Sequence, residues 1–208
     1  MHASLLPKYR GASPINRAII EGEIETGIST MYTDVGMDTG DVLLVSKVHI
    51  DEDMTAGELH DKLSRLGADV LRDTLAKLED GSIERRPQDE SRSSYAGMMD
   101  KDTGRIDWAL KARKIHNLVR GTDPGPGAYT WYKDIKLKIW KTKVIREEDS
   151  GEVFGKIISV SKDGIDVSTG SGVLRILELQ APSKKRMQVS QYILGNVMEE
   201  GEIFWQGN

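Results

Sequence analysis

The sequence predicts an α/β protein in which an incomplete doubly wound α/β domain is followed by a small domain of short strands. Helix and strand patterns alternate through residues 13–81, as in doubly wound proteins. Short strand patterns separated by turn residues fill residues 128–179, and such strands usually close into a small barrel or sandwich. The charge and the aromatic content also change near residue 100.

That change sets the domain boundaries. Residues 1–100 contain 11 Lys and Arg against 19 Asp and Glu, whereas residues 101–208 contain 18 against 14 and hold all four tryptophans. We therefore expect the first domain at residues 1–84, a polar linker without hydrophobic period at 85–103, and the second domain at 104–208. A mildly basic domain suits a polyanionic partner, although an ordinary solvated surface explains so small an excess equally well.

The composition excludes several classes. No cysteine is present, so disulfides, thiolate nucleophiles and cysteine-ligated zinc are ruled out. No apolar run approaches the roughly 20 residues that cross a bilayer, and the N-terminus has no signal segment. We expect a cytoplasmic protein without a membrane partner.

Local signals place the elements of the first domain. Ser13-Pro14 begins a helix that ends by Gly22. Residues 27–33 and 42–50 are strands. Thr55 begins the longest helix through a capping box with a glutamate three positions later. Its predicted apolar face consists of Leu59, Leu63, Leu66, Val70, Leu71, Leu75 and Leu78. Two strands are too few for a doubly wound sheet, so we expect its first strands to be absent.

The second domain begins with a helix at residues 108–120. A loop rich in glycine and proline follows at 122–127. The predicted strands are residues 128–133, 135–144, 153–160, 165–168 and 173–179, and a last helix is predicted at 189–198.

Two side chains of the first domain suit acid–base chemistry. His2 precedes a segment that is neither helical nor strand-like, and Asp38 lies in a glycine-bracketed loop between two strands. Loops at strand ends are where α/β proteins bind ligands. On the residues alone, each is more often an ordinary surface feature. The Asp38-Thr39-Gly40 triplet also resembles that of aspartic proteases, but those enzymes need two copies and one is present.

A wider match changes that weighting. HASLLPKYRG from His2, GISTMYTDVGMDTGD from Gly27, and the helix beginning at Thr55 resemble the formyltransferase family that uses 10-formyltetrahydrofolate. The loop around Asp38 is the most specific of these motifs. The resemblance continues at Tyr95-Ala96, Arg105-Ile106-Asp107-Trp108 and Lys184-Lys185-x-Met187, so it covers nearly the whole chain.

Within this family, the chain looks most like the enzymes that act on methionyl-tRNA. The resemblance implies a Rossmann-like formyltransferase domain followed by an OB-like β-barrel that binds tRNA. It implies transfer of a formyl group from 10-formyltetrahydrofolate, as cosubstrate, to the α-amine of methionyl-initiator-tRNA, without a metal. An amino-sugar-nucleotide formyltransferase and a tRNA-binding fragment without catalysis are the alternatives.

The family's catalytic set is an Asn-x-His unit and an aspartate, which match His2 and Asp38. The asparagine has no position here, so we expect the natural chain to extend upstream and this chain to be inactive. Asparagine and protonated imidazole can stabilise the tetrahedral oxyanion, and Asp38 can take the amine proton. The residues implied to contact tetrahydrofolate are Ser4, Leu5, Leu6 and Pro7.

Basic side chains of the second domain are candidate nucleic-acid contacts. Lys136 and Lys138 alternate along one strand and therefore share a face, with Trp131 and Trp140 nearby. A charged outer face that prevents aggregation is an equally good interpretation. The further candidates are Arg10, Lys184, Lys185 and Arg186.

Overall fold

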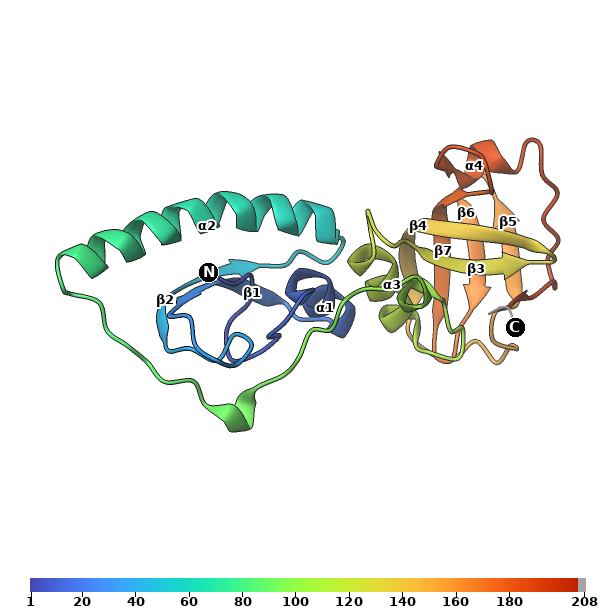
Figure 1. Cartoon of the computed structure of the whole chain (residues 1–208). Coiled ribbons are helices and arrows are strands. Elements are labelled where there is room, and N and C mark those ends of the chain that lie inside the picture. Colours follow the sequence, from blue (N-terminus) through green and yellow to red (C-terminus); the bar gives the residue numbers. More distant parts are fainter. Residues whose placement is uncertain (206–208) are drawn as a thin grey trace. The chain divides into compact units, whose positions relative to one another are not determined.

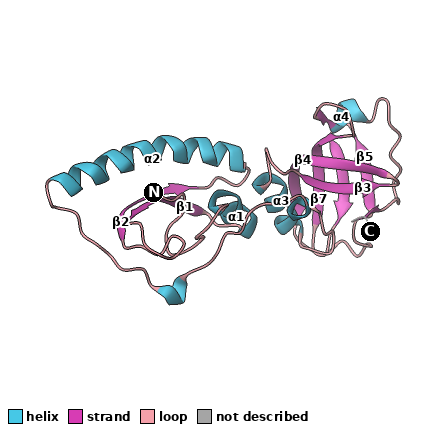
Figure 2. Ribbon diagram, in the orientation of Figure 1, coloured by secondary structure: helices cyan, strands magenta, loops and turns pink. Residues whose placement is uncertain are grey.

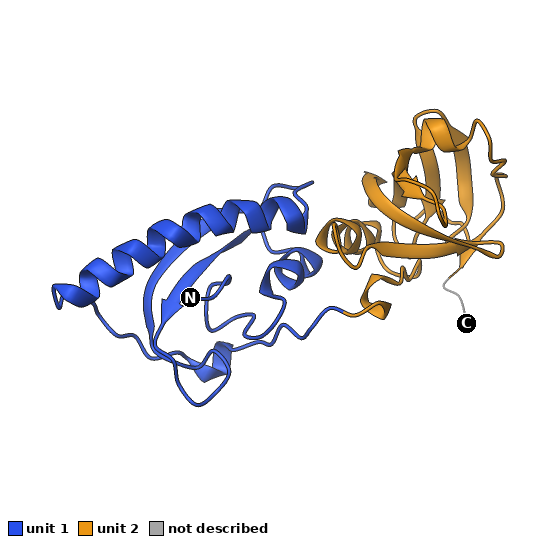
Figure 3. Ribbon diagram, turned by 45° about the horizontal axis from the view of Figure 1, so that its top comes forward, with its two compact units in different colours: residues 1–99 blue, residues 100–208 orange. Residues whose placement is uncertain are grey.

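The computed structural model describes residues 1–205 and divides the chain into two compact units, Met1–Met99 and Asp100–Asn208 (Figure 3). We describe each unit by itself.

Unit 1 is built on two strands, β1 (Glu25–Met31) and β2 (Val42–His49), which pair antiparallel. The long helix α2 (Ala56–Glu79) runs along this pair, and the short helix α1 (Pro14–Glu21) lies beside it (Figure 1). The core between them consists of Ala18, Ile19, Ile28, Ile50, Ala56, Leu59, Leu63 and Val70. The α/β class is as predicted, but these two strands do not form the parallel pairing of a doubly wound sheet.

The helix ends in unit 1 follow their local signals. The Thr55 hydroxyl accepts from the Glu58 amide at 3.2 Å, and the Glu58 carboxylate accepts from the Thr55 amide at 2.8 Å, so the predicted capping box is formed. Gly22 ends α1 at φ 84°, a left-handed conformation that favours glycine.

One part of the predicted α2 face is wrong. Leu71 and Leu75 are 41% and 58% exposed, whereas Val70 and Thr74 are buried. The buried stripe keeps the three- and four-residue spacing from Leu59 onward, and Leu71 and Leu75 lie one position farther around the helix.

The expected linker is not a free connection over most of its length, because residues 85–99 belong to unit 1. Arg86 exchanges backbone hydrogen bonds with Val42, and Arg10 forms an isolated bridge with Tyr95. The segment contains one 3₁₀ turn, η1 (Glu90–Arg92). We call residues 86–96 the strap, since they connect the segment after His2 with the loop that holds Asp38.

Unit 2 begins with a 3₁₀ turn, η2 (Asp102–Gly104), and contains an antiparallel sheet with the order β5-β6-β7-β4-β3-β9. Figure 2 shows its strands in magenta and its helices in cyan. The strands are β3 (Ala128–Tyr132), β4 (Ile135–Arg146), β5 (Ile157–Ser161), β6 (Gly164–Ser168), β7 (Val173–Gln180), β8 (Met187–Gln188), which pairs with β7, and β9 (Phe204–Trp205).

Backbone hydrogen bonds join the two ends of this order. The Phe204 amide donates to the Gly155 carbonyl, and the Ile157 amide donates to the Glu202 carbonyl, both at 2.8 Å. Residues 201–205 therefore bond to β3 on one side and to residues 155–157 on the other. The sheet closes into the small barrel that the sequence predicted.

Both helices of unit 2 are shorter than predicted. Helix α3 is Ala112–Gly121, because Asp107 accepts from the amides of Ala109 and Leu110 in a turn that precedes it. Helix α4 is Val189–Tyr192 only. Leu194 and Val197 are 87% and 82% exposed, so burial of their side chains does not stabilise a longer helix. No helix within residues 1–205 is both long and apolar enough to span a membrane.

Candidate functional site

The structure brings His2 and Asp38 together. The imidazole Nδ1 of His2 lies 3.5 Å from the Oδ2 atom of Asp38, and both side chains are largely buried, at 9% and 19% exposed. On the other edge of the ring, Nε2 lies 2.8 Å from the carbonyl oxygen of Tyr9. A carbonyl oxygen only accepts hydrogen bonds, so Nε2 carries a proton and Nδ1 faces the carboxylate.

The backbone on each side of His2 fixes this arrangement. The His2 amide donates to the Ser29 carbonyl at 2.8 Å, and the Ser29 amide donates to the His2 carbonyl at 2.9 Å, so His2 pairs with β1 through an isolated antiparallel bridge. Tyr9 and Asp38, which supply the two partners of the imidazole, both have left-handed backbone conformations, at φ 59° and 56°. Such strain in residues other than glycine often accompanies functional sites.

The carboxylate of Asp38 has a second contact. Its Oδ2 atom accepts from the backbone amide of Gly11 at 2.8 Å, so one oxygen faces both an amide N–H and the imidazole of His2. An ionised carboxylate is the natural acceptor for such donors.

The strap contributes residues that the sequence did not identify. The Gln88 side-chain amide donates to the carbonyl oxygens of Asp38 and Gly40, both at 2.7 Å. Arg10 in turn donates to the Gln88 oxygen and makes two hydrogen bonds to the Glu90 carboxylate, at 2.8 and 2.9 Å. No local sequence pattern predicts these contacts, because they join segments that are far apart in the sequence.

The prediction that Arg10 contacts phosphate is therefore wrong. Its side chain is fully buried, and its guanidinium is held by Gln88 and Glu90. The Glu90 hydrogen bonds raise the pKa of Arg10 above its ordinary value, and the same bonds lower the pKa of the Glu90 carboxyl. An arginine in this state is a structural ion-pair partner.

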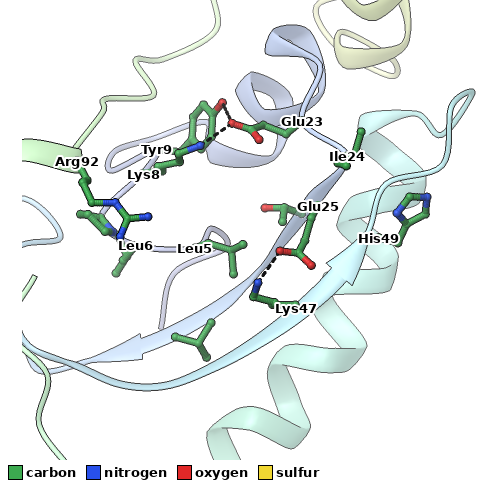
Figure 4. Close-up of a pocket in the computed structure, with 13 residues that line it drawn as sticks. Leu5, Leu6, Lys8, Tyr9, Glu23, Ile24, Glu25, Lys47, His49 and Arg92 are labelled. Carbon is green, nitrogen blue, oxygen red and sulfur yellow. Dashed lines mark hydrogen bonds and ion pairs between the residues drawn. The ribbon is translucent and has the colours of Figure 1, made fainter. Parts of the chain in front are cut away.

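A cavity of about 610 Å³ lies beside the candidate site, and Leu5, Leu6 and Pro7 line it (Figure 4). Its wall also carries ion pairs, between Lys8 and Glu23 and between Lys47 and Glu25. Ser4 is not part of the lining. It is fully buried, and its hydroxyl donates to the Lys8 carbonyl at 2.6 Å, so it shapes the turn that the other three residues occupy.

Tyr9 belongs to both features. Its carbonyl holds the His2 ring, and its side chain lines the cavity. Burial, together with the hydrogen bond that its hydroxyl donates to the Glu23 carboxylate, raises the pKa of Tyr9 well above its ordinary value. The tyrosine is therefore a neutral donor at neutral pH, and it connects the cavity wall to the His2–Asp38 pair.

Comparison with known proteins identifies the family. Residues 1–75 match the family model described as formyl transferase, and residues 98–197 match the model of the formyl transferase C-terminal domain. The chain belongs to the formyl transferase family. It is 55% identical over 206 residues to the methionyl-tRNA formyltransferase of Acetivibrio thermocellus and 55% identical over 203 residues to that of Clostridioides difficile. These matches cover 99% and 98% of this chain, which spans just under two thirds of the relatives' length, 66% and 65%.

Solved structures share the fold at lower identity. WlaRD, a sugar 3N-formyl transferase, has a TM-score of 0.70 and 22% identity, and the match covers 88% of this chain and 65% of that one. HypX from Aquifex aeolicus, solved with tetrahydrofolic acid, has a TM-score of 0.68 and 16% identity, over 98% of this chain and 37% of that one.

In unit 2, Lys136 and Lys138 lie on one outer face of the barrel with aromatic rings. The Lys136 ammonium is 3.5 Å from the centre of the Tyr129 ring and 5.1 Å from that of Trp131. The Lys138 ammonium donates to the Pro126 carbonyl at 3.0 Å and lies 5.3 Å from the Trp140 ring. We call these five side chains, Tyr129, Trp131, Lys136, Lys138 and Trp140, the aromatic–lysine face.

The basic residues near residue 185 divide into two kinds. Lys184 and Lys185 are exposed. Arg186 instead donates to the carboxylates of Asp123 and Glu178, and its guanidinium lies 5.3 Å from the Trp140 ring. Of the predicted phosphate contacts in this stretch, the two lysines are accessible, and Arg186 is held by two carboxylates.

Proposed function

We propose that this chain carries the catalytic histidine and aspartate of an enzyme that transfers a formyl group from 10-formyltetrahydrofolate to the α-amine of methionyl-initiator-tRNA, in the cytoplasm, for translation initiation. The 3.5 Å approach of His2 to Asp38 is the observation that carries the proposal. The methionyl-tRNA formyltransferases that are 55% identical to the chain supply the substrate class.

The arrangement suggests a role for each group. The amine nitrogen attacks the formyl carbon, the new C–N bond forms, and the carbonyl oxygen becomes negatively charged before the bond to the folate nitrogen breaks. The Tyr9 carbonyl fixes the ring of His2 through Nε2, so the reacting groups approach the Nδ1 edge, beside the Asp38 carboxylate. A protonated Nδ1 donates toward the oxyanion, and Asp38 accepts the proton that the attacking amine releases. The folate nitrogen takes up a proton as it leaves.

The cavity beside this pair suits the formyl donor. Leu5, Leu6 and Pro7 present apolar surface to a flat ring system, and Tyr9 connects that surface to His2. Tetrahydrofolate combines apolar rings with hydrogen-bonding edges, which matches an apolar wall that also carries charged side chains.

The aromatic–lysine face and the Lys184–Lys185 pair suit the tRNA. Ammonium groups contact phosphates, and the exposed faces of tryptophan rings accept stacked bases. Trp205 extends this face, because its ring lies 5.9 Å from that of Trp131 and is 38% exposed.

The test joins this chain to the part of the Acetivibrio thermocellus relative that the match does not cover, and assays formyl transfer. The joined enzyme should formylate methionyl-initiator-tRNA, and Asp38→Asn should lower kcat by roughly 100- to 1000-fold, since it removes the proton acceptor. Asp51→Asn is the matched control, because that carboxylate is exposed and pairs with His49 instead.

A parallel assay offers an amino-sugar nucleotide as acceptor. If the joined enzyme formylates the sugar nucleotide and not the charged tRNA, the proposal is wrong and the protein is an amino-sugar-nucleotide formyltransferase. Binding of tRNA by a joined protein that transfers no formyl group to either acceptor would leave only a tRNA-binding role.

A further inference from the structure

We infer that Gln88 is a positioning residue for Asp38, and that the buried Arg10, itself bound by Glu90, holds Gln88 in place for that task. The inference rests on the proposed function for its catalytic meaning. The positioning itself is a property of this chain and can be measured without catalysis.

The argument begins with the backbone of Asp38. A left-handed conformation at φ 56° is unfavourable for an aspartate, so surrounding contacts must hold it. The Gln88 amide nitrogen donates to the carbonyl of Asp38 and to that of Gly40, both at 2.7 Å, and so grips the loop on both sides of Thr39. These two hydrogen bonds fix the backbone position from which the Asp38 side chain extends.

Gln88 is itself fixed by one arginine. The Nε and one terminal nitrogen of Arg10 donate to the Gln88 oxygen, at 3.1 and 2.7 Å. With its oxygen occupied by these donors, the amide of Gln88 has one orientation, and both of its N–H groups are directed to the loop. The two terminal nitrogens of Arg10 also donate to the Glu90 carboxylate.

The same arginine connects the two halves of the site. Tyr9, which precedes Arg10, supplies the carbonyl that orients His2, and Gly11, which follows it, supplies the amide that binds the Asp38 carboxylate. A fully buried guanidinium at the centre therefore sets the distance between the imidazole and the carboxylate. This explains why the most polar stretch of the strap packs into unit 1.

The test measures amide hydrogen exchange of the whole chain by NMR. The Gly11 amide donates to the Asp38 carboxylate, so its exchange rate shows whether that carboxylate stays in place. Asp38→Ala removes the carboxylate and gives the exchange rate of the Gly11 amide without this hydrogen bond. In Gln88→Glu the side chain still accepts from Arg10 but offers no donor to the loop, so the Gly11 amide should exchange roughly tenfold faster, as for the loss of one hydrogen bond. The Ile28 amide of β1 should keep its rate.

The matched control is Gln180→Glu in unit 2, where the glutamine also donates to a backbone carbonyl, that of Lys184. It should leave the Gly11 rate unchanged. Arg10→Lys should give an intermediate rate, because a lysine cannot hold Gln88 and Glu90 in a fixed fork. If Gln88→Glu also accelerates exchange of the Ile28 amide, the added charge has disturbed unit 1 as a whole. Gln88→Met, which removes the same donors without adding a charge, is then measured at the Gly11 and Ile28 amides.

An unchanged Gly11 rate in both Gln88 variants, when Asp38→Ala accelerates it, overturns the inference. In the joined enzyme, Gln88→Met should lower kcat and leave the KM for both substrates within about twofold, as expected when an interaction of the transition state alone is lost. If the joined enzyme transfers no formyl group with its natural residues, the proposed function fails, and the exchange result still decides the positioning.

Discussion

Arg10 and Glu90 lie 80 positions apart in the chain and are joined by two hydrogen bonds, of 2.8 and 2.9 Å. The guanidinium is fully buried, whereas the glutamate side chain is 67% exposed. The positive charge of Arg10 is therefore buried, and the carboxylate that neutralises it lies at the protein surface.

This pair makes the stability of unit 1 depend on pH. The Arg10 hydrogen bonds lower the pKa of Glu90 in the folded protein, so the folded state binds fewer protons than the unfolded chain. The stabilisation is complete above the ordinary glutamate value of about 4.3 and is lost as the pH falls through the lowered folded value. Glu90→Gln should destabilise unit 1 at pH 7 and match the natural chain in acid.

Amide exchange of β1 and β2 measures this effect, because all four tryptophans lie in unit 2 and their fluorescence does not report unit 1. Glu84→Gln is the control, since that glutamate is 78% exposed and pairs with exposed Arg86. A stability difference between Glu90→Gln and the natural chain that stays constant down to pH 2 contradicts the prediction.

Gly40 admits no side chain. A Cβ atom there would lie 1.8 Å from the Tyr32 carbonyl oxygen, so Gly40→Ala must displace the backbone next to Asp38. We expect a loss of about 1–3 kcal/mol in the stability of unit 1 and faster exchange at Gly11. Gly97→Ala has nothing within 4 Å of its new Cβ and should change neither. Equal behaviour of the two variants would contradict the close approach.

Closure of the barrel depends on Phe204. Its ring is 1% exposed, stacks on Trp108 with centroids 5.6 Å apart and contacts Tyr132 edge-on. Phe204→Ala should lower the free energy of unfolding of unit 2 by about 3–5 kcal/mol, measured by tryptophan fluorescence in urea. Trp205→Ala, next in the chain and partly exposed, should lower it by roughly 1–2 kcal/mol. The reverse order would show that the barrel does not rest on the Phe204 contact.

The exposed lysines should govern the salt dependence of tRNA binding. Replacing both Lys184 and Lys185 with alanine should reduce the slope of log affinity against log salt by about one for each phosphate contact that is lost. Lys162→Ala, at the β5–β6 turn, should leave the slope unchanged. Arg186→Ala should instead destabilise unit 2, because it leaves Asp123 and Glu178 without their shared partner. A slope that responds equally to Lys162 and to the pair would contradict this assignment.

The sequence predicted the elements that local chemistry encodes. The capping box at Thr55 and the left-handed Gly22 are written in a few adjacent residues, so the helix ends they mark were found correctly. Helix α4 was overestimated because Leu194 and Val197 have helical spacing, and spacing does not show whether a surface is there to cover them.

The candidate site was only partly visible. The residues alone indicated His2 and Asp38 as candidates for acid–base chemistry, and the family resemblance favoured that role over an ordinary surface histidine and an ordinary turn. Arg10 was assigned to phosphate because an arginine near a candidate site looks the same in sequence whether it is exposed or buried. Gln88 and Glu90 were missed because their partners lie 50 and 80 positions away, and contacts made by single polar side chains leave no hydrophobic period.

The bonds that residues 201–204 make to residues 155–157 also order events during translation. The strands and helices described for unit 1 have all been synthesised once residue 99 has been added. In unit 2, β3 and β5 stay open edges until β9 leaves the ribosome, because β9 and the residues before it join them. The two units of the nascent chain therefore mature one after the other, and the surface that we assign to nucleic acid is completed last.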